Sequence, residues 1–224
     1  GFGVRTLGLE GDTANFFANS TGDPLLARPF FNALLNQEDS LLIAYVDPVN
    51  GPVAEGSVAV QYNSSFVATD VYTRIMMERC RTNRVDLIGG YSYFRLGDNL
   101  SIRSFHTATD IINNGTTFDI RDQFSSSNVF HGGMLGFTGS KGRGRWSLDW
   151  LSKISLGANH QRVRINGSTT ITPLMGAPAT NVGGLLAQPS NIGNYDNSQT
   201  VVVPEFSATL NYHMNSHWSV GIGY

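Results

Sequence analysis

Charged side chains recur at every second position in several strand-like segments, and their common role would be to line a polar interior. In 66–79 and in 145–159, acidic and basic residues alternate with valine, isoleucine, leucine and tryptophan. Side chains at alternate positions of a β-strand share one face of the sheet. The sequence therefore predicts one polar, lumen-facing side that carries the charged residues Asp70, Arg74, Glu78, Asp86, Arg103, Arg145, Asp149, Lys153 and Glu205.

Two chemical roles are open for these charges. They could line a water-filled pore and set its preference for cations or anions. They could instead form salt bridges that fill a narrow interior, whose width depends on the number of strands. Asp149 and Lys153 are separated by roughly 13 Å along a strand, so each needs a partner on a neighbouring strand. The candidate partners are Arg74, Arg103 or Arg145 for the acid, and Asp86 or Glu205 for the amine.

Patterns typical of catalysis or of metal binding are not convincing in this chain. The sequence has no Gly-x-Ser-x-Gly elbow, and neither Gly1–Gly3 nor Gly142–Gly144 continues into a nucleotide-binding loop. His213 and His217 have the spacing of a helical zinc site, but the residues between them favour a hairpin turn. We therefore expect a protein that is not an enzyme and that binds no metal and no cofactor.

The composition restricts the class of protein further. The chain has 224 residues, a formal net charge of -2 and 14% charged residues, which gives no reason to expect a nucleic-acid partner. Its longest strongly apolar run, 41–46, is too short for a membrane-spanning helix. The single cysteine, Cys80, allows no intrachain disulfide. We expect one domain over 1–224, and strand-like sequence at both ends suggests a mature or partial chain.

The side opposite the charges is apolar and rich in aromatic residues. The alternation in 145–164 is longer than the about 5–6 residues of an ordinary strand, and a tilted bilayer-spanning strand needs about 9–11. Such strands alternate between lipid-facing and lumen-facing residues. The residues expected to face lipid or another subunit are Trp146, Trp150, Leu156, Phe206, Leu210, Tyr212, Trp218 and Ile222.

The expected connections differ between the two ends of the strands. We predict strands at about 3–16, 56–62, 66–79, 84–96, 99–108, 128–139, 145–164, 199–212 and 217–224. Short turns at 63–65, 97–99, 139–144 and 213–216 would then share one end. The other end would carry a short turn at 80–83 and the long loops 17–55, 109–127 and 165–198. This asymmetry favours an all-β, antiparallel, up-and-down transmembrane barrel. Nine is an odd number, so either one strand is miscounted or part of the sheet is missing. We expect missing sequence or a neighbouring chain, because the two edges would otherwise stay open.

Several stretches also resemble a known family. They are 26–32, 84–96, 122–124, 128–133 and 183–193, and in this order they resemble the planctomycete family that is seventh in the beta-barrel porin series. The resemblance covers about 3–224 and implies an outer-membrane β-barrel. It supplies no catalytic or ligand-binding residues.

The expected function is a porin-like passive channel for ions or small solutes in the outer membrane. The lipid bilayer is the expected partner, together with further copies of the chain or a neighbouring barrel chain. One alternative is a structural outer-membrane barrel with a plugged lumen that forms oligomers or arrays. The other is a soluble β-sandwich that binds a ligand, which would have its apolar residues inside.

Overall fold

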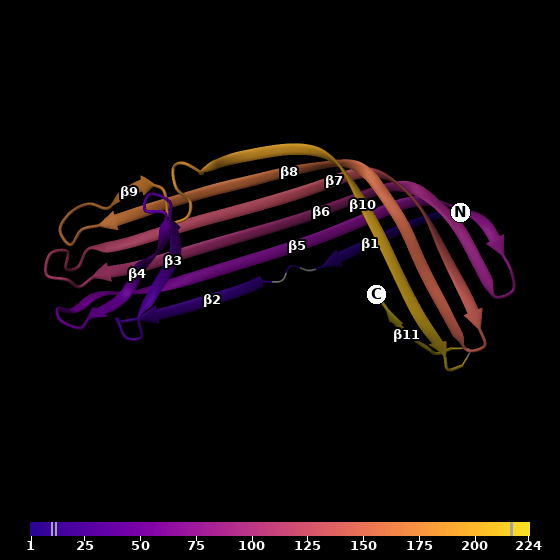
Figure 1. Ribbon diagram of the computed structural model, residues 1–224, viewed down its shortest axis with the longest axis horizontal. Coiled ribbons are helices and arrows are strands. Elements are labelled where there is room, and N and C mark those ends of the chain that lie inside the picture. Colours follow the sequence, from indigo (N-terminus) through magenta and orange to yellow (C-terminus); the bar gives the residue numbers. More distant parts are fainter. Residues whose placement is uncertain (10, 12, 216) are drawn as a thin grey trace.

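Antiparallel strands make up most of the protein. The computed structural model describes residues 1–9, 11, 13–215 and 217–224. The long strands lie side by side in sequence order (Figure 1): β5 (Gly51–Arg79), β6 (Asn83–Ala108), β7 (Thr117–Arg143), β8 (Trp146–Thr172) and β10 (Gly193–His213). Shorter strands flank them: β1 (Phe2–Leu9) and β2 (Thr13–Ser20) pair with β5, β9 (Ala179–Val182) with β8, and β11 (Ser219–Gly223) with β10. A hairpin of β3 (Leu26–Asn32) and β4 (Gln37–Asp47) precedes β5.

The sheet is open. Among the described residues, no backbone ladder joins β1 or β2 at one edge to β10 or β11 at the other. The expected all-β antiparallel class is confirmed, whereas the closed barrel is not seen. The described residues form eleven strands rather than the nine predicted, and the strand limits differ from those predicted.

Two predicted turns are wrong. Residues 63–65 lie inside β5 and residues 97–99 lie inside β6, where Asn63 pairs with Asn99 and Ser65 pairs with Gly97. The Asn, Asp, Ser and Gly residues at these positions are typical of turns. Here they occupy a polar part of the sheet, and the backbone ladder continues through them without a break. Each pair of predicted strands on either side is therefore one long strand.

The connections of the long strands differ in length. Residues 80–82 and 144–145 make short turns at one end of the sheet, where the chain also passes from β10 to β11. Residues 21–50, 109–116 and 173–192 make the longer connections at the other end. The segments expected as loops are partly strand, because β7 begins at Thr117 and β8 continues to Thr172. Pro29 lies in the edge strand β3, where its missing backbone N–H is tolerated.

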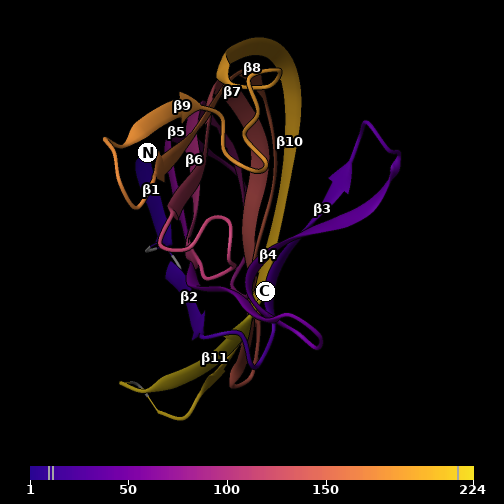
Figure 2. The same ribbon diagram turned by 90° about the vertical axis from the view of Figure 1, so that its left-hand side faces the viewer.

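The sheet has two chemically different faces. We call the face that carries Asp70, Ser92, Lys153 and Ser155 the inner face, and all four of these residues are buried. We call the opposite face the outer face. Large buried apolar side chains on the inner side include Ile43, Ile88, Ile120, Phe130 and Met134. The β3–β4 hairpin projects from the sheet in the side view (Figure 2).

Glycines on the inner face allow the sheet to curl. A Cβ added to Gly90, Gly136 or Gly157 would collide with a backbone carbonyl oxygen of the neighbouring strand, from Val71, Ser152 and His131 respectively. Removing side chains from the inner side of a bend lets adjacent backbones approach more closely. Figure 1 shows the long strands bending together into an arch.

Candidate functional site

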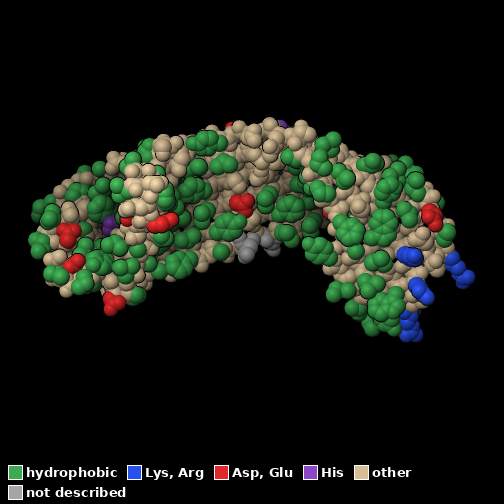
Figure 3. Space-filling view, viewed as in Figure 1, with side chains coloured by type: hydrophobic (Ala, Val, Ile, Leu, Met, Phe, Trp, Pro, Cys, Tyr) green, Lys and Arg blue, Asp and Glu red, His purple; other side chains and the backbone are tan. Residues whose placement is uncertain are grey.

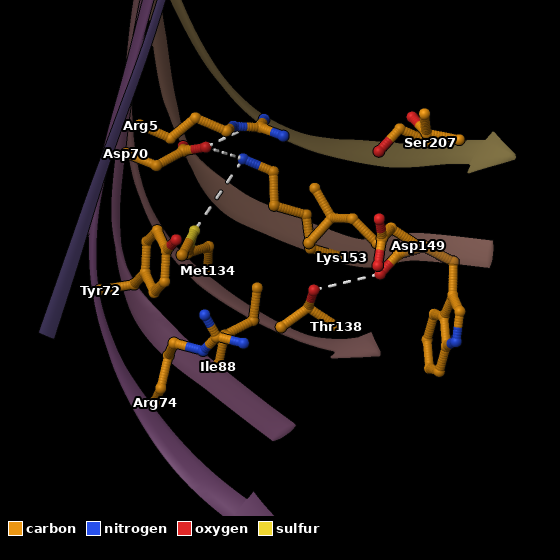
Figure 4. Close-up of a pocket in the computed structure, with 13 residues that line it drawn as sticks. Arg5, Asp70, Tyr72, Arg74, Ile88, Met134, Thr138, Asp149, Lys153 and Ser207 are labelled. Carbon is orange, nitrogen blue, oxygen red and sulfur yellow. Dashed lines mark hydrogen bonds and ion pairs between the residues drawn. The ribbon is translucent and has the colours of Figure 1, made fainter. Parts of the chain in front are cut away.

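Four charged side chains meet on the inner face. Lys153 of β8 forms an ion pair with Asp70 of β5 and, at 3.0 Å, a second one with Glu205 of β10. Arg5 of β1 forms ion pairs with Glu205 and, at 3.1 Å, with Asp70. We call Arg5, Asp70, Lys153 and Glu205 the inner cluster; Figure 4 shows Arg5 and Lys153 both directed toward Asp70. Two bases and two acids make the cluster neutral when all four are ionised.

The centre of the inner cluster is shielded from water. The side chains of Lys153 and Asp70 are 1% and 4% exposed, whereas those of Arg5 and Glu205 are 39% and 30% exposed. Buried charges are costly unless they are paired and hydrogen-bonded. Asp70 accepts a hydrogen bond of 2.6 Å from the Ser92 hydroxyl in addition to its ion pairs. The two central charges are therefore fully partnered within the interior.

A second ionic group and a small cavity lie next to the inner cluster. Asp86, whose side chain is 1% exposed, is paired with Arg74 and, at 2.9 Å, with Arg84. A cavity of 220 Å³ lies between the two groups, and Arg5, Asp70, Arg74 and Lys153 are among the residues that line it (Figure 4). Fixed charges of both signs thus surround a space large enough for water, which is the chemistry of an ion-selective lining.

Asp122 anchors two long connections to the inner face at the other end of the sheet. Its carboxylate binds the Arg28 guanidinium of β3 at 2.5 Å and accepts backbone N–H bonds from Leu186 and Ala187 at 2.9 and 2.8 Å. Arg28 also donates to the Ser104 hydroxyl at 3.0 Å. Both Asp122 and Ser104 are completely buried. One carboxylate therefore holds the β3–β4 hairpin and the segment around residue 186 against the sheet.

The predicted lumen-facing charges divide into two groups. The structure places six of them on the inner face, and three of these six belong to the inner cluster; the six are Asp70, Arg74, Asp86, Asp149, Lys153 and Glu205. Asp149 is exposed and accepts a hydrogen bond of 2.8 Å from Asn211. The other three, Glu78, Arg103 and Arg145, lie elsewhere.

Each of these three positions has a local explanation. A register shift between Met76 and Glu78 places Glu78 opposite Val85, away from the face of Asp86. Arg103 is on the outer face, because β6 continues through 97–99 and keeps the phase of Tyr91 and Tyr93. Arg145 is an exposed residue of the turn between β7 and β8.

The outer face carries an exposed apolar belt near the short turns. Its members lie on β5, β7, β8, β10 and β11, at positions that face away from the inner face. In β8 the belt and its Trp146 border extend as far as Leu156, which matches the about 9–11 residues of a tilted bilayer-spanning strand. We call the following exposed or partly exposed residues the outer belt: Val71, Ile75, Leu135, Phe137, Leu148, Trp150, Ile154, Leu156, Val202, Phe206, Leu210 and Ile222.

Aromatic residues mark both limits of the outer belt. The rings of Trp146 and Tyr212 are 4.8 Å apart near the short turns. At the other limit, the His131 ring lies 5.1 Å from that of Tyr93. Beyond this limit the outer face becomes polar, with Arg95, Ser127, Arg162, Arg164 and Asn194 at corresponding positions. An apolar band between aromatic borders is typical of a transmembrane barrel.

The structure places most of the residues expected to face lipid on the outer face. These are Trp146, Trp150, Leu156, Phe206, Leu210, Tyr212 and Ile222. Trp218 lies in the turn before β11 and is 69% exposed. The seven residues that lie in strands point to the face opposite the one that carries Lys153 and Glu205.

Arg103 takes part in an ionic group of the polar region, outside the outer belt. It donates two hydrogen bonds of 2.8 Å to Asp119, and Arg121 donates a third of 2.8 Å. The hydrogen bonds from Arg103, with those from Arg121, lower the pKa of the Asp119 carboxyl from 3.8 to about 2, against the opposing effect of burial. The carboxylate therefore stays ionised over the whole physiological pH range.

Arg5, Arg28 and Asp122 are among the contributors to these sites that were missing from the prediction. Arg5 had a detectable signal, since Gly3 and Arg5 alternate with Phe2 and Val4. Arg28 and Asp122 had none, because their contact joins positions 94 residues apart through a hairpin and a long strand. Within the part of the chain that the structure describes, no cluster of His, Cys, Asp or Glu could hold a metal ion. The same residues include no helix long and apolar enough to cross a membrane.

Comparison with known proteins adds the family. No curated protein matches the chain. A family model described as "Putative beta barrel porin-7 (BBP7)" matches residues 1–224. The chain belongs to the beta barrel porin-7 family.

Proposed function

We propose that the protein is an outer-membrane β-barrel that lets ions or small solutes pass passively through a charged interior. The outer belt is the observation that carries this proposal, since it has the strand length of a bilayer core and is exposed on the outer face. A soluble sandwich would bury such a belt, because large exposed apolar patches are rare in soluble monomers. Family membership supports the same conclusion.

The positions of the charges fit this environment. Lys153 is next to Ile154 of the outer belt in β8, so in a membrane the two residues would lie at nearly the same depth in the bilayer. A lysine on the lipid face near the bilayer midplane would cost about 2–4 kcal/mol. The opposite face gives Lys153 two acidic partners, Asp70 and Glu205. This arrangement suits a protein with lipid outside and a polar interior.

Closure of the barrel is part of the proposal. Backbone groups along β1 and β2, and along 193–207 of β10, have no strand partner on one side among the described residues. Unpaired backbone groups in hydrocarbon cost several kcal/mol each, so membrane-spanning sheets close. We propose that further strand pairing joins the two edges in the membrane.

In this account the inner cluster is the narrowest part of the passage. Passage would require Arg5 and Glu205, its more exposed members, to move aside. The fixed charges there would set the ion preference.

A second function has specific support. Lys153 and Asp70 are almost completely buried, and the ion pair of Arg5 with Glu205 links the two edge strands across the interior. A lumen filled in this way is typical of small barrels. It would make the protein a structural barrel, alone or in oligomers, that conducts nothing.

Spin labels along β8 test the membrane location. In a Cys80→Ser background, single cysteines would replace residues 148–164 one at a time, and the protein would be reconstituted in lipid vesicles. We expect contact with dissolved oxygen to peak at even positions from Leu148 to Leu156 and to fall at odd positions. Even positions from Arg162 onward should instead contact a water-soluble nickel chelate. An accessibility pattern with no period of two, or with water contact throughout, would contradict membrane insertion.

A further inference from the structure

Five basic side chains crowd the short-turn end of the sheet. All five are exposed, and we call them the basic collar: Arg79, Arg81, Lys141, Arg143 and Arg145. Figure 3 shows Lys and Arg side chains gathered at this end of the molecule. Among the described residues, none of these side chains has an ion pair within 4.0 Å. The collar is therefore a concentration of uncompensated positive charge.

Backbone hydrogen bonds hold the turns of the collar side by side. The Gly142 N–H donates to the Thr82 carbonyl at 2.7 Å, which joins the β7 end to the turn between β5 and β6. The His213 N–H donates to the Arg145 carbonyl at 2.8 Å, which joins the next turn along. The positive charges are thus fixed on adjacent turns of the sheet.

Among the described residues, the acidic side chains near the collar form no ion pair with it. Asp86 is bound by Arg74 and Arg84. Asp149 is on the inner face and accepts a hydrogen bond from Asn211. Glu78 contacts the Asn83 amide at 3.4 Å. By contrast, Arg162 in the polar region of the outer face has Asp196 at 2.8 Å.

The collar lies directly beside the aromatic border of the outer belt. Arg143 is opposite Trp146 in the ladder between β7 and β8, and Trp146 packs on Tyr212. Trp and Tyr concentrate at the level of lipid headgroups. If the outer belt occupies the hydrocarbon, the collar therefore lies at the depth of the phosphates in the adjoining leaflet.

We propose that the basic collar binds the phosphate groups of anionic phospholipids in the leaflet at the short-turn end. This inference rests on the proposed membrane location, and it adds a lipid partner. Guanidinium groups bind phosphate in a bidentate manner. Each basic residue near an anionic membrane surface strengthens binding about fivefold, and salt screens the effect.

The tryptophans provide a local probe. The chain has three, Trp146, Trp150 and Trp218, and all lie in β8 or the last turn, close to the collar. The protein would be reconstituted in vesicles of phosphatidylglycerol and phosphatidylcholine in which either lipid carries bromine, which quenches tryptophan fluorescence on contact. We expect brominated phosphatidylglycerol to quench more strongly at equal mole fraction, with a preference of about fivefold or more at low salt.

Charge-neutral variants localise the effect. The triple variant Lys141→Gln, Arg143→Gln, Arg145→Gln should lose the preference, as should the unmodified protein at high salt. The matched control Arg162→Gln, Arg164→Gln at the other end of the belt should keep it, and Arg143→Lys should keep most of it.

The outcomes separate this inference from the proposed function. Quenching by neither lipid would show that the protein is not inserted, which contradicts the proposed function. Equal quenching by both lipids would leave insertion intact and overturn the role of the collar. A preference that survives in the triple variant, or that disappears in the control variant, would also overturn it.

Discussion

Arg5 of β1 and Glu205 of β10 form an ion pair although their strands lie at opposite edges of the open sheet. The strands between them are β5, β6, β7 and β8. In a flat sheet, five spacings of about 4.8 Å would separate the edge strands by roughly 24 Å. The ion pair therefore requires the sheet to curl strongly around its inner face. The inner cluster thus holds the curl as well as lining the interior.

Removal of the charge on Asp70 should destabilise this curl. In Asp70→Asn, the buried Lys153 ammonium keeps Glu205 but loses its better-shielded partner, and we expect a loss of on the order of 3 kcal/mol in the free energy of unfolding. This loss is measured by urea titration of the protein in lipid vesicles, with tryptophan fluorescence as the signal for unfolding. The control Asp196→Asn removes an exposed partner of Arg162 and should change the value by less than about 1 kcal/mol. Equal losses in the two variants would contradict a structural role for the inner cluster.

The bend should be sensitive to one added methyl group on the inner face. In Gly157→Ala the new Cβ would meet the His131 carbonyl oxygen, and we expect a loss of about 1–3 kcal/mol in the same urea titration. Gly133→Ala is the matched control, because its Cβ would meet nothing closer than the Gly90 carbonyl oxygen at 3.9 Å. If Gly157→Ala is no less stable than Gly133→Ala, the close approach of β7 and β8 at this point is wrong.

Local alternation assigns side chains to the two faces within one continuous strand. It assigned the wrong face where two predicted strands were one strand, or where a strand contains an extra residue. Lys153 and Trp150 lie on opposite faces of the sheet, because a period of two fixes a side chain's face within one uninterrupted strand. Arg103 lies on the outer face and not on the predicted one. The residues at 97–99 resemble a turn, but β6 continues through them, so Arg103 shares a face with Tyr91 and Tyr93. Glu78 lies on the opposite face from the one predicted, because one extra residue in β5 moves each side chain after it to the other face of the sheet.

The contacts between distant strands had no local signal at all. Arg5 meets Glu205 across 200 residues, and Arg28 meets Asp122 across 94. Such pairs follow from the curl of the sheet and from the way a hairpin folds back on it. Neither property can be read from alternation in a single strand.

Asp122 should control how firmly the long connections are held. Asp122→Asn leaves the buried Arg28 without a charged partner and weakens the bonds to the N–H groups of Leu186 and Ala187. We expect faster amide hydrogen exchange in both the β3–β4 hairpin and the segment 183–192. The control Asp47→Asn, at the last residue of β4, should affect only the turn that follows, whose Val49 and Asn50 N–H groups donate to this carboxylate. Release of only one of the two segments would contradict a shared anchor.

The pKa of Asp119 shows whether Arg103 and Arg121 bind its carboxylate in the polar region outside the outer belt. Its pKa of about 2 is below the ordinary 3.8, because Arg103 and Arg121 bind the ionised carboxylate. The stabilisation is therefore complete above about pH 4 and is lost as the pH falls through about 2. Carboxyl ¹³C NMR of the detergent-solubilised protein should show a midpoint near 2, which Arg103→Gln raises. A midpoint near 3.8 in the unmodified protein would mean that the two arginines do not bind Asp119.

The passage of ions through the charged interior is tested most directly by planar bilayer recording under a salt gradient. The account predicts measurable conductance for the unmodified protein. In Lys153→Gln the acids Asp70 and Glu205 remain without their shared base, so the reversal potential should shift toward cation preference, and Arg5→Gln should shift it in the same direction. Circular dichroism would establish that each variant keeps its β-sheet content. An absence of conductance in all three proteins, or a reversal potential that both substitutions leave unchanged, would contradict the channel and favour the closed structural barrel.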